Sequence, residues 1–268
     1  MVPSRSSAYI AVEKRQSGDM RNNLFKKEHR KLFMFWLIIL LVCLVLAVLI
    51  ILFIVLPLVV KYSFSIQQKI VFTHGYADSS KGTLTEARVV NDCKQLYSWI
   101  RNKTQANIYV WGQSLGSSLA ANTVLQVEKD GLQPKGLILE SAFTSFEDEL
   151  YVHPYGKIFA WLPWFYVTVV KPLRENGFIF DTSSYLKKIK CSVMILHAQD
   201  DSVVPYRFGR KLYEISSNRT GTAATSIYHE FDASLEYNHY FIYQDPFLKY
   251  YIMQFIGKNI SLVPVKVL

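Results

Sequence analysis

The chain has 268 residues, a formal net charge of +9 and 50% hydrophobic residues. Most of the basic surplus lies at the amino-terminal end, because residues 1–31 hold eight Lys or Arg against three Asp or Glu, or +5 of the total. A basic tail beside an apolar segment is typical of a tail that faces anionic lipid, so we expect no nucleic-acid partner. The chain contains neither C-x-x-C nor H-E-x-x-H, and we expect no metal site.

An apolar segment follows this tail. Residues 1–31 are polar and lack periodicity, so we expect a disordered basic tail. Residues 32–60 contain no charged residue, and Leu32 to Leu56, before Pro57, would span about 37 Å as a helix, enough for a bilayer core of about 30 Å. The run is too long for a signal-peptide core and lacks a small-residue cleavage site, which predicts an uncleaved signal anchor over residues 32–60.

The charges that flank the anchor predict its orientation. The basic run Lys26 to Lys31 precedes it, whereas only Lys61 and Lys69 follow nearby, so the amino terminus should lie in the cytosol. Residues 61–268 would then be lumenal or extracellular. Three glycosylation sequons fall in that part of the chain, at Asn102, Asn218 and Asn259. The three cysteines are too few for a disulfide framework, and we expect unpaired thiols.

Residues 61–268 have the length of one domain and show alternating strand-like and helix-like patterns. The predicted strands are 69–73, 108–111, 136–140, 192–197 and 226–231, and the predicted helices are 85–101, 115–130, 206–216 and 241–257. Short apolar strands that alternate with amphipathic helices predict an α/β fold: a doubly wound, mostly parallel sheet with helices on both faces.

An insertion rich in aromatic residues, 151–180, interrupts this alternation. Its aromatic residues include Phe159, Trp161, Trp164, Phe165, Tyr166, Phe178 and Phe180. Such a cap over a nucleophile would suit an acyl chain or a membrane-derived substrate, since Trp and Tyr favour the bilayer interface. The alternative is that these side chains pack on the sheet, and the sequence leaves both readings open.

A G-x-S-x-G motif, Gly112 to Gly116, lies between a predicted strand and a predicted helix, which is the context of a nucleophile elbow. Ser114 is therefore a candidate nucleophile. The tight turn requires very small residues two positions to either side, and both are glycine. An ordinary glycine-rich turn is the alternative interpretation.

The α/β-hydrolase order of nucleophile, acid and base is also present. Asp201 follows a predicted buried strand, and we prefer it to Asp200 because the acid usually precedes a short Val-Val-Pro run. His239 follows the last predicted strand and would act as the base, with Asp201 fixing its tautomer. Each residue also has a plain structural reading, as a turn former or a surface histidine. The other histidines carry less weight: His29, His153, His197, which should pack at its strand end, and His229.

The chain resembles the type-twelve α/β-hydrolase-domain lipases, which are membrane-anchored monoacylglycerol and lysophosphatidylserine lipases. The resemblance rests on Gly112 to Gly116, Leu137 to Thr144, Ile195 to Asp201 and Phe208 to Leu212. It runs from about residue 75 to 258 and also takes in the anchor. It implies a catalytic triad of Ser114, Asp201 and His239, no cofactor, and a single-pass type II protein that cleaves single-chain lipid esters. The implied location is the endoplasmic reticulum membrane, with the plasma membrane as the alternative.

The chain departs from that family between the anchor and the turn Gly75 to Ser79. Family members have a long segment there, with several strands and a His-Gly-Asn loop that supplies one oxyanion-hole N–H. Here the predicted strand Lys69 to Thr73 leads at once into the turn, so we expect a deletion, as in an alternative transcript; His74-Gly75 only resembles the loop. The N–H of Leu115 would remain as an oxyanion donor. Loss of its partner would cost about a hundred- to a thousandfold in rate.

Three functional hypotheses follow. The first is a membrane-bound serine hydrolase that cleaves acylglycerol or lysophospholipid esters through an acyl-enzyme. The second is a non-catalytic membrane protein that keeps the triad but cannot stabilise a tetrahedral intermediate. The third, weaker hypothesis is a peptidase on the same fold. Labelling of the serine by an activated phosphonate separates the first from the second.

Overall fold

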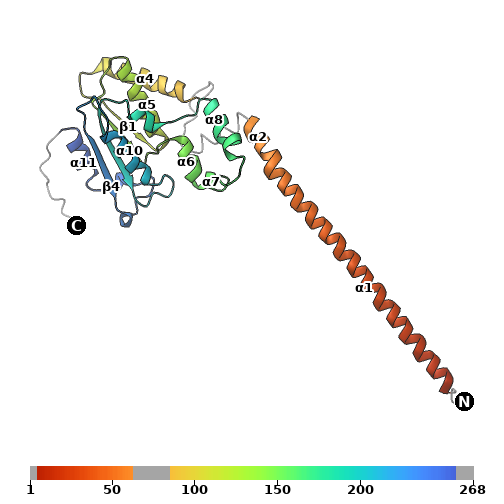
Figure 1. Cartoon of the computed structure of the whole chain (residues 1–268). Coiled ribbons are helices and arrows are strands. Elements are labelled where there is room, and N and C mark those ends of the chain that lie inside the picture. Colours follow the sequence, from red (N-terminus) through yellow and green to blue (C-terminus); the bar gives the residue numbers. More distant parts are fainter. Residues whose placement is uncertain (1–4, 63–84, 258–268) are drawn as a thin grey trace. The chain divides into compact units, whose positions relative to one another are not determined.

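The computed structural model describes residues 5–62 and 85–257, and the chain divides into two compact units, 1–56 and 57–268. The first unit consists of helix α1 (Arg5–Ile50) and the π-helical turn η1 (Ile51–Val55) (Figure 1). Residues His29–Val59 form a helical stretch that is long and apolar enough to cross a membrane. Helix α1 begins at Arg5, so the prediction of a disordered tail over residues 1–31 is wrong where the structure describes that tail. Residues 4–31 contain no proline, and helix formers such as Glu, Lys, Arg and Gln recur among them, which favours a helix.

The helical stretch continues past Pro57, because α2 (Leu56–Tyr62) includes this proline. In a regular α-helix the Pro57 ring would clash with the carbonyl of Phe53. The wider turn η1 precedes it, and the Leu56 N–H donates to the carbonyl of Ile51, five residues back. The π-turn is thus a local adjustment of the kind that lets a helix accommodate a proline.

The second unit contains a sheet of four parallel strands in the order β1-β2-β3-β4 (Figure 1). The strands are β1 (Tyr109–Gln113), β2 (Gly136–Glu140), β3 (Ser192–Ala198) and β4 (Ser226–Phe231). The prediction of a mostly parallel sheet is confirmed. The predicted strand at residues 69–73 and the turn at residues 75–79 lie outside the described residues.

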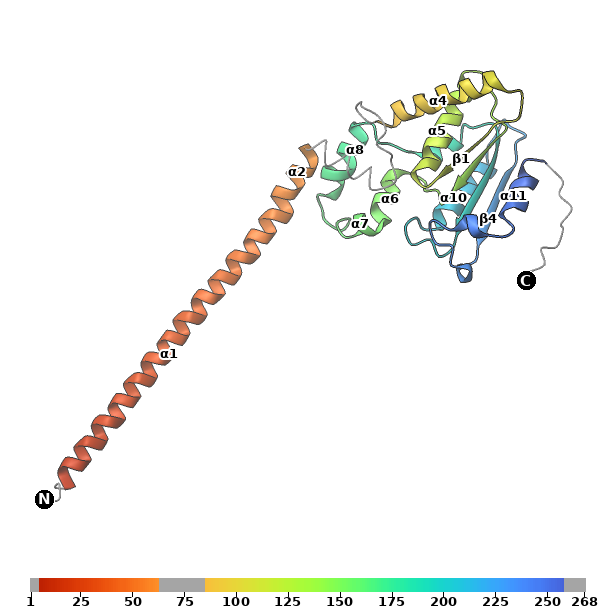
Figure 2. The ribbon, with the colours of Figure 1, turned by 180° about the vertical axis from the view of Figure 1, so that it is seen from behind.

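Helices connect and cover these strands. They are α4 (Glu86–Lys103), α5 (Leu115–Lys129), α9 (Thr182–Leu186), α10 (Arg207–Ser217) and α11 (Leu248–Phe255). Side chains alternate across the sheet, as the period of a strand requires. Leu137 and Leu139 pack with α5, α9 and α10, whereas Ile138 and Met194 pack on the opposite face with α11. Figure 2 shows α5 and α11 on opposite faces of the sheet. The sheet is therefore covered on both faces, as predicted.

The last predicted helix, 241–257, is wrong in its first half. A 3-10 turn, η4 (Ile242–Gln244), and an extended Asp245 come before α11. Pro246 explains the break, because the residue before a proline is disfavoured in the helical region and a proline has no N–H to donate.

The aromatic insertion and the residues just before it form several short helical segments. They are α6 (Phe146–Val152), α7 (Pro154–Lys157), η2 (Tyr166–Val170) and α8 (Lys171–Glu175). Three of its aromatic side chains are buried: Phe165, Phe178 and Phe180. Five are exposed: Tyr151, Tyr155, Phe159, Trp161 and Tyr166. The two interpretations of the insertion therefore apply to different residues, with one set packed in the interior and the other open to solvent or a partner.

Candidate active site

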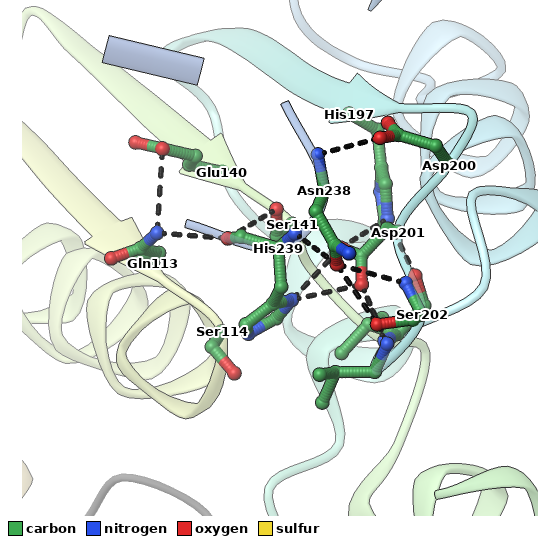
Figure 3. Close-up of polar contacts among 12 residues, drawn as sticks. Gln113, Ser114, Glu140, Ser141, His197, Asp200, Asp201, Ser202, Asn238 and His239 are labelled. Carbon is green, nitrogen blue, oxygen red and sulfur yellow. Dashed lines mark hydrogen bonds and ion pairs between the residues drawn. The ribbon is translucent and has the colours of Figure 1, made fainter. Parts of the chain in front are cut away.

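The candidate site lies where the four parallel strands end. Ser114 directly follows β1, Asp201 follows β3, and His239 lies in the loop after β4. Carboxyl ends of parallel strands meet at one edge of a sheet, so residues far apart in sequence come together there. Figure 3 shows the three side chains in one cluster, with the imidazole of His239 between Asp201 and Ser114.

Ser114 occupies a strained backbone conformation, with φ 52° and ψ −123°. Its N–H donates to the carbonyl of Glu140 at 2.9 Å, which fastens the turn to the end of β2. A non-glycine residue in this region is uncommon and costs about 1–3 kcal/mol, and such strain clusters at active sites. The strand-to-helix turn at Ser114 therefore has the geometry of a nucleophile elbow.

The two glycines of the motif are not equivalent. A Cβ on Gly112 would collide with the backbone of Gly116 and lie 2.8 Å from the Cβ of Ala120. A Cβ on Gly116 would meet nothing within 4 Å. The predicted need for a very small residue holds at Gly112 and is wrong at Gly116, because a Cβ on Gly112 would collide with helix α5, whereas one on Gly116 would lie in open space.

Asp201 is buried and its carboxylate accepts several hydrogen bonds. Oδ1 accepts from the N–H groups of Val203 and Val204 at 2.9 and 2.8 Å. Oδ2 lies 2.8 Å from His239 Nδ1 and 3.4 Å from His197 Nε2. Burial raises the pKa of Asp201, but the bonds from His197 and His239 outweigh it and hold this pKa well below its ordinary value. The group is therefore a stable carboxylate at neutral pH.

His239 is oriented by this carboxylate. Its Nδ1 lies 3.0 and 2.8 Å from the two oxygens of Asp201, and the ring is 2% exposed. Because a carboxylate only accepts, Nδ1 carries the proton and Nε2 presents a lone pair. Within the described residues the Ser114 hydroxyl forms no hydrogen bond, and the ring of His239 extends toward it (Figure 3). Such catalytic bonds often tighten only when substrate is bound.

Asn238 fixes the backbone of His239. Its Oδ1 accepts from the N–H of His239 at 2.7 Å and from the N–H and hydroxyl of Ser202 at 3.2 and 2.9 Å. The N–H of Asn238 donates to Asp200 Oδ2 at 2.9 Å, and its own φ is 46°. Asp200, the acid not preferred in the sequence analysis, thus ties the histidine loop to the acid loop.

The carbonyl of His239 is tied to the nucleophile strand. Gln113 Nε2 donates to it at 3.1 Å, and the hydroxyl of Ser141 donates at 3.4 Å. Gln113 also reaches Glu140 Oε1 at 3.4 Å, and burial raises the pKa of Glu140. The roles of Gln113, Ser141 and Asn238 are not predictable from sequence, because these residues bond to partners that are distant in sequence. Their positions next to Ser114, Glu140 and His239 are the only sequence signal for them.

The remaining predicted residues are placed as follows. Leu115 begins α5, so its N–H is one of the first four in a helix and has no intrahelical acceptor, which leaves it available to an oxyanion.

Asn102 and Asn218 are exposed, whereas Asn259 lies outside the described residues. Within residues 5–62 and 85–257 no three His, Cys, Asp or Glu side chains are grouped as metal ligands.

Three other histidines, His153, His197 and His229, contact residues other than Ser114. His153 accepts from the N–H of Tyr155 at 3.3 Å, and His229 stacks on Tyr251 with ring centroids 4.2 Å apart. His197 is fully buried near the end of β3, as predicted.

A buried acid lies beside this cluster. Glu149 on α6 is 1% exposed, and neither of its carboxyl oxygens has a hydrogen-bond partner in the described structure. Burial is the main cause that raises its pKa to about 9; the charge of Asp201 adds to the rise and that of Arg207 opposes it. Glu149 is therefore a neutral carboxylic acid at pH 7, which avoids two adjacent buried negative charges.

Comparison with known proteins identifies relatives of this chain. No family model matches it. The lysophosphatidylserine lipase ABHD12 of Bos taurus is 36% identical over 187 residues, 69% of this chain and 47% of that protein. ABHD12 of Danio rerio is 34% identical over 68% of this chain and 48% of that protein. Human ABHD12B is 32% identical over 54% of this chain and 40% of that protein. The chain spans about half the length of the curated relatives it matches.

Solved structures also resemble the chain. An acetyl xylan esterase from Paenibacillus sp. R4 is 20% identical, with a TM-score of 0.49 over 69% of this chain and 60% of that chain. The Pyrococcus furiosus esterase PF2001 is 19% identical, with a TM-score of 0.48 over 66% of this chain and 64% of that chain. The parallel sheet, the elbow and the homology to ABHD12 together establish an α/β-hydrolase fold.

We expect Gly112→Ala and Gly116→Ala to behave oppositely. The added methyl of G112A has no space and should destabilise the domain by about 1–3 kcal/mol and abolish any reactivity of Ser114. G116A places a methyl in open space within a helix and should be neutral or stabilise by up to about 1 kcal/mol. Thermal unfolding of the full chain in detergent, with phosphonate labelling, measures both; equal effects of the two variants would contradict this geometry.

We expect Glu149→Gln to stabilise the protein in a pH-dependent manner. The ordinary pKa of this group is 4.5 and its folded pKa is about 9, so between these values the folded state holds a proton that the unfolded state lacks. The stability of the wild type should therefore fall by about 1.4 kcal/mol per pH unit as pH rises through this window. Unfolding of E149Q and wild type by urea should differ little below pH 4.5 and increasingly up to about pH 9. A difference independent of pH would show that Glu149 is ionised in the folded protein.

Proposed function

We propose that this chain, a homologue of the ABHD12-type α/β-hydrolases, is a membrane-anchored serine hydrolase that cleaves single-chain lipid esters. The observation that carries the proposal is the buried Asp201–His239 pair, 2.8 Å apart, whose imidazole extends toward a serine on a strained elbow. This arrangement supplies an ionised acid, a base with a fixed tautomer and an accessible hydroxyl. Those are the three parts that acyl transfer through a covalent intermediate requires.

The reaction would proceed in two halves. Ser114 Oγ attacks the ester carbonyl carbon while His239 Nε2 takes its proton, and the resulting imidazolium is stabilised by Asp201. The tetrahedral oxyanion accepts from the N–H of Leu115. Collapse breaks the ester C–O bond, the imidazolium protonates the leaving alkoxide, and an acyl-enzyme remains. Water, deprotonated by His239, then attacks the acyl-enzyme and releases the fatty acid and Ser114.

Two features support a lipid substrate. The relatives are named as lysophosphatidylserine lipases, and we extend that substrate class, together with monoacylglycerol, to this chain. Within the insertion, Phe159, Trp161 and Tyr166 expose aromatic surface that a lipid chain or a bilayer interface could cover.

A membrane location rests on the helix His29–Val59. We propose a single-pass type II topology in the endoplasmic reticulum membrane, with residues 61–268 in the lumen, because the basic residues concentrate before the helix. The plasma membrane, with the domain extracellular, is the alternative location.

A non-catalytic membrane protein is the second candidate function. The chain spans 47% of the bovine relative, and within the described residues the Ser114 hydroxyl has no hydrogen bond to His239. In this reading the site resembles a hydrolase but does not form an acyl-enzyme.

Fluorophosphonate labelling of the full chain in secretory-pathway membranes tests the proposal. We expect labelling in the wild type and its loss in Ser114→Ala, because the phosphonate reacts with the activated hydroxyl alone. Ser98→Ala, which removes a hydroxyl bonded within α4, is the matched control and should label normally. Labelled protein is then assayed against monoacylglycerol, lysophosphatidylserine and aminoacyl substrates, the last of which would indicate a peptidase. A folded, glycosylated wild type that does not label would support the non-catalytic function.

The topology predicts glycosylation. In a eukaryotic secretory pathway we expect a mass shift that endoglycosidase treatment removes and that Asn102→Gln and Asn218→Gln reduce stepwise, since both residues are exposed. A membrane-inserted chain whose mass does not change on endoglycosidase treatment would place the hydrolase domain on the cytosolic side.

A further inference from the structure

A second histidine contacts the carboxylate of Asp201. His197 is the sixth residue of β3 and is completely buried, and the reaction described above does not use it. Its Nε2 lies 2.9 Å from the carbonyl oxygen of Val204 and 3.4 Å from Asp201 Oδ2. His197 thus reaches from the strand across the turn 198–204 that carries the candidate catalytic acid (Figure 3).

These neighbours determine the tautomer of His197. A carbonyl and a carboxylate can only accept, so the proton of a neutral ring lies on Nε2 and is shared between Val204 O and Asp201 Oδ2. Nδ1 has no hydrogen-bond partner in the described structure. The ring is therefore held from one side only, by the two acceptors of the acid turn.

The other side of the ring rests on a glycine. Gly209 lies within helix α10, and a Cβ there would lie 2.6 Å from His197 Nδ1 and 3.1 Å from its Cβ and Cγ. Glycine is a poor helix former, and its φ in α10 is not positive, so backbone conformation does not explain its presence. The space that a side chain at position 209 would occupy is filled by the imidazole, which explains the glycine.

We propose that His197, seated against Gly209, is a positioning residue that orients the carboxylate of Asp201 toward His239. The inference rests on the proposed function of Ser114, Asp201 and His239 as a triad. His197 touches no reacting atom, and it acts through Asp201. Its N–H limits rotation of the carboxylate at Oδ2, while the N–H groups of Val203 and Val204 hold Oδ1.

Loss of the His197 donor has a predictable effect on catalysis. A carboxylate with one donor fewer is freer to rotate and is a stronger acceptor for the remaining imidazole. The rate of serine acylation should fall, and the acid limb of its pH profile should move to higher pH, because the protonated base is held more strongly. The charges of Asp201 and Arg207 act on Glu149, and that of His239 acts on Glu140, but these groups are the same in every variant.

The experiment measures fluorophosphonate labelling of the full chain in membranes as kinact and KI, from pH 5 to 9, with thermal unfolding of the same samples. In His197→Leu, which keeps the apolar bulk and removes the donor, kinact should fall about tenfold or more while KI stays within about twofold. His197→Gln, which can return an amide donor near Nε2, should recover most of the rate. Gly209→Ala should slow labelling by displacing the ring, although alanine favours the helix.

His229→Leu is the matched control. His229 lies on the neighbouring strand, in register with Leu196, and contacts neither Asp201 nor Ser114 through any hydrogen bond of the described structure. This variant loses a partly buried histidine without touching the acid turn. It should label at the wild-type rate with an unshifted pH profile.

The outcomes distinguish a failure of the proposed function from a failure of the proposed role of His197. A wild type without Ser114-dependent labelling overturns the proposed function and this inference with it. A wild type that labels, with H197L at the same rate and pH midpoint, overturns the inference alone, as does a loss in H197L that equals its loss of folded protein. If H197L does not fold, H197Q and G209A decide: normal labelling in G209A overturns the inference, and slowed labelling with intact folding supports it.

Discussion

The site depends on keeping one negative charge ionised in the interior of the protein. Asp201 is buried, and an unpaired carboxylate in such a place would take up a proton. Its oxygens instead accept from the N–H groups of Val203 and Val204 and face the rings of His197 and His239. All these donors come from β3, the turn after it and the loop after β4. The proposed chemistry therefore requires the register of those two strands, since a slip would move His239 away from Asp201.

The sheet could be predicted from sequence because its signals are local. Residues 136–140 and 226–231 were predicted as strands with the bounds that β2 and β4 have, and apolar runs between helical patterns are strong indicators. The error in the last predicted helix also has a local cause, because Pro246 divides it. Pro57, by contrast, is accommodated within a helical stretch by a π-turn. Proline signals a break in regular hydrogen bonding, but tertiary packing decides whether the helix stops or continues.

The candidate triad could be predicted because chain order and strand ends carry the information: Ser114, Asp201 and His239 each follow a strand. The groups that orient them could not, because their contacts join distant segments. Gln113 meets the carbonyl of a residue 126 positions later, and Asn238 bonds Ser202 across 36 positions. The hydrophobic periodicity of a sequence contains no information about such long-range hydrogen bonds. The opposite error occurred at Gly116, where the motif suggested a steric need that the open space beside its Cα does not impose.

In the proposed reaction, acylation and turnover would depend on different parts of this chain. The serine, acid and base follow β1, β3 and β4, and the four-stranded sheet that aligns them lies wholly within the described residues. Oxyanion stabilisation needs more, since the start of α5 supplies the N–H of Leu115 and an oxyanion hole commonly has a second donor, each worth about 2.7–4 kcal/mol of transition-state stabilisation. An activated phosphonate has a lower intrinsic barrier than a lipid ester, so it tolerates the loss of one donor better. If the proposed reaction occurs with one oxyanion donor, the serine would label readily while esters turn over slowly. The ratio of labelling rate to turnover would then measure how complete the oxyanion hole is.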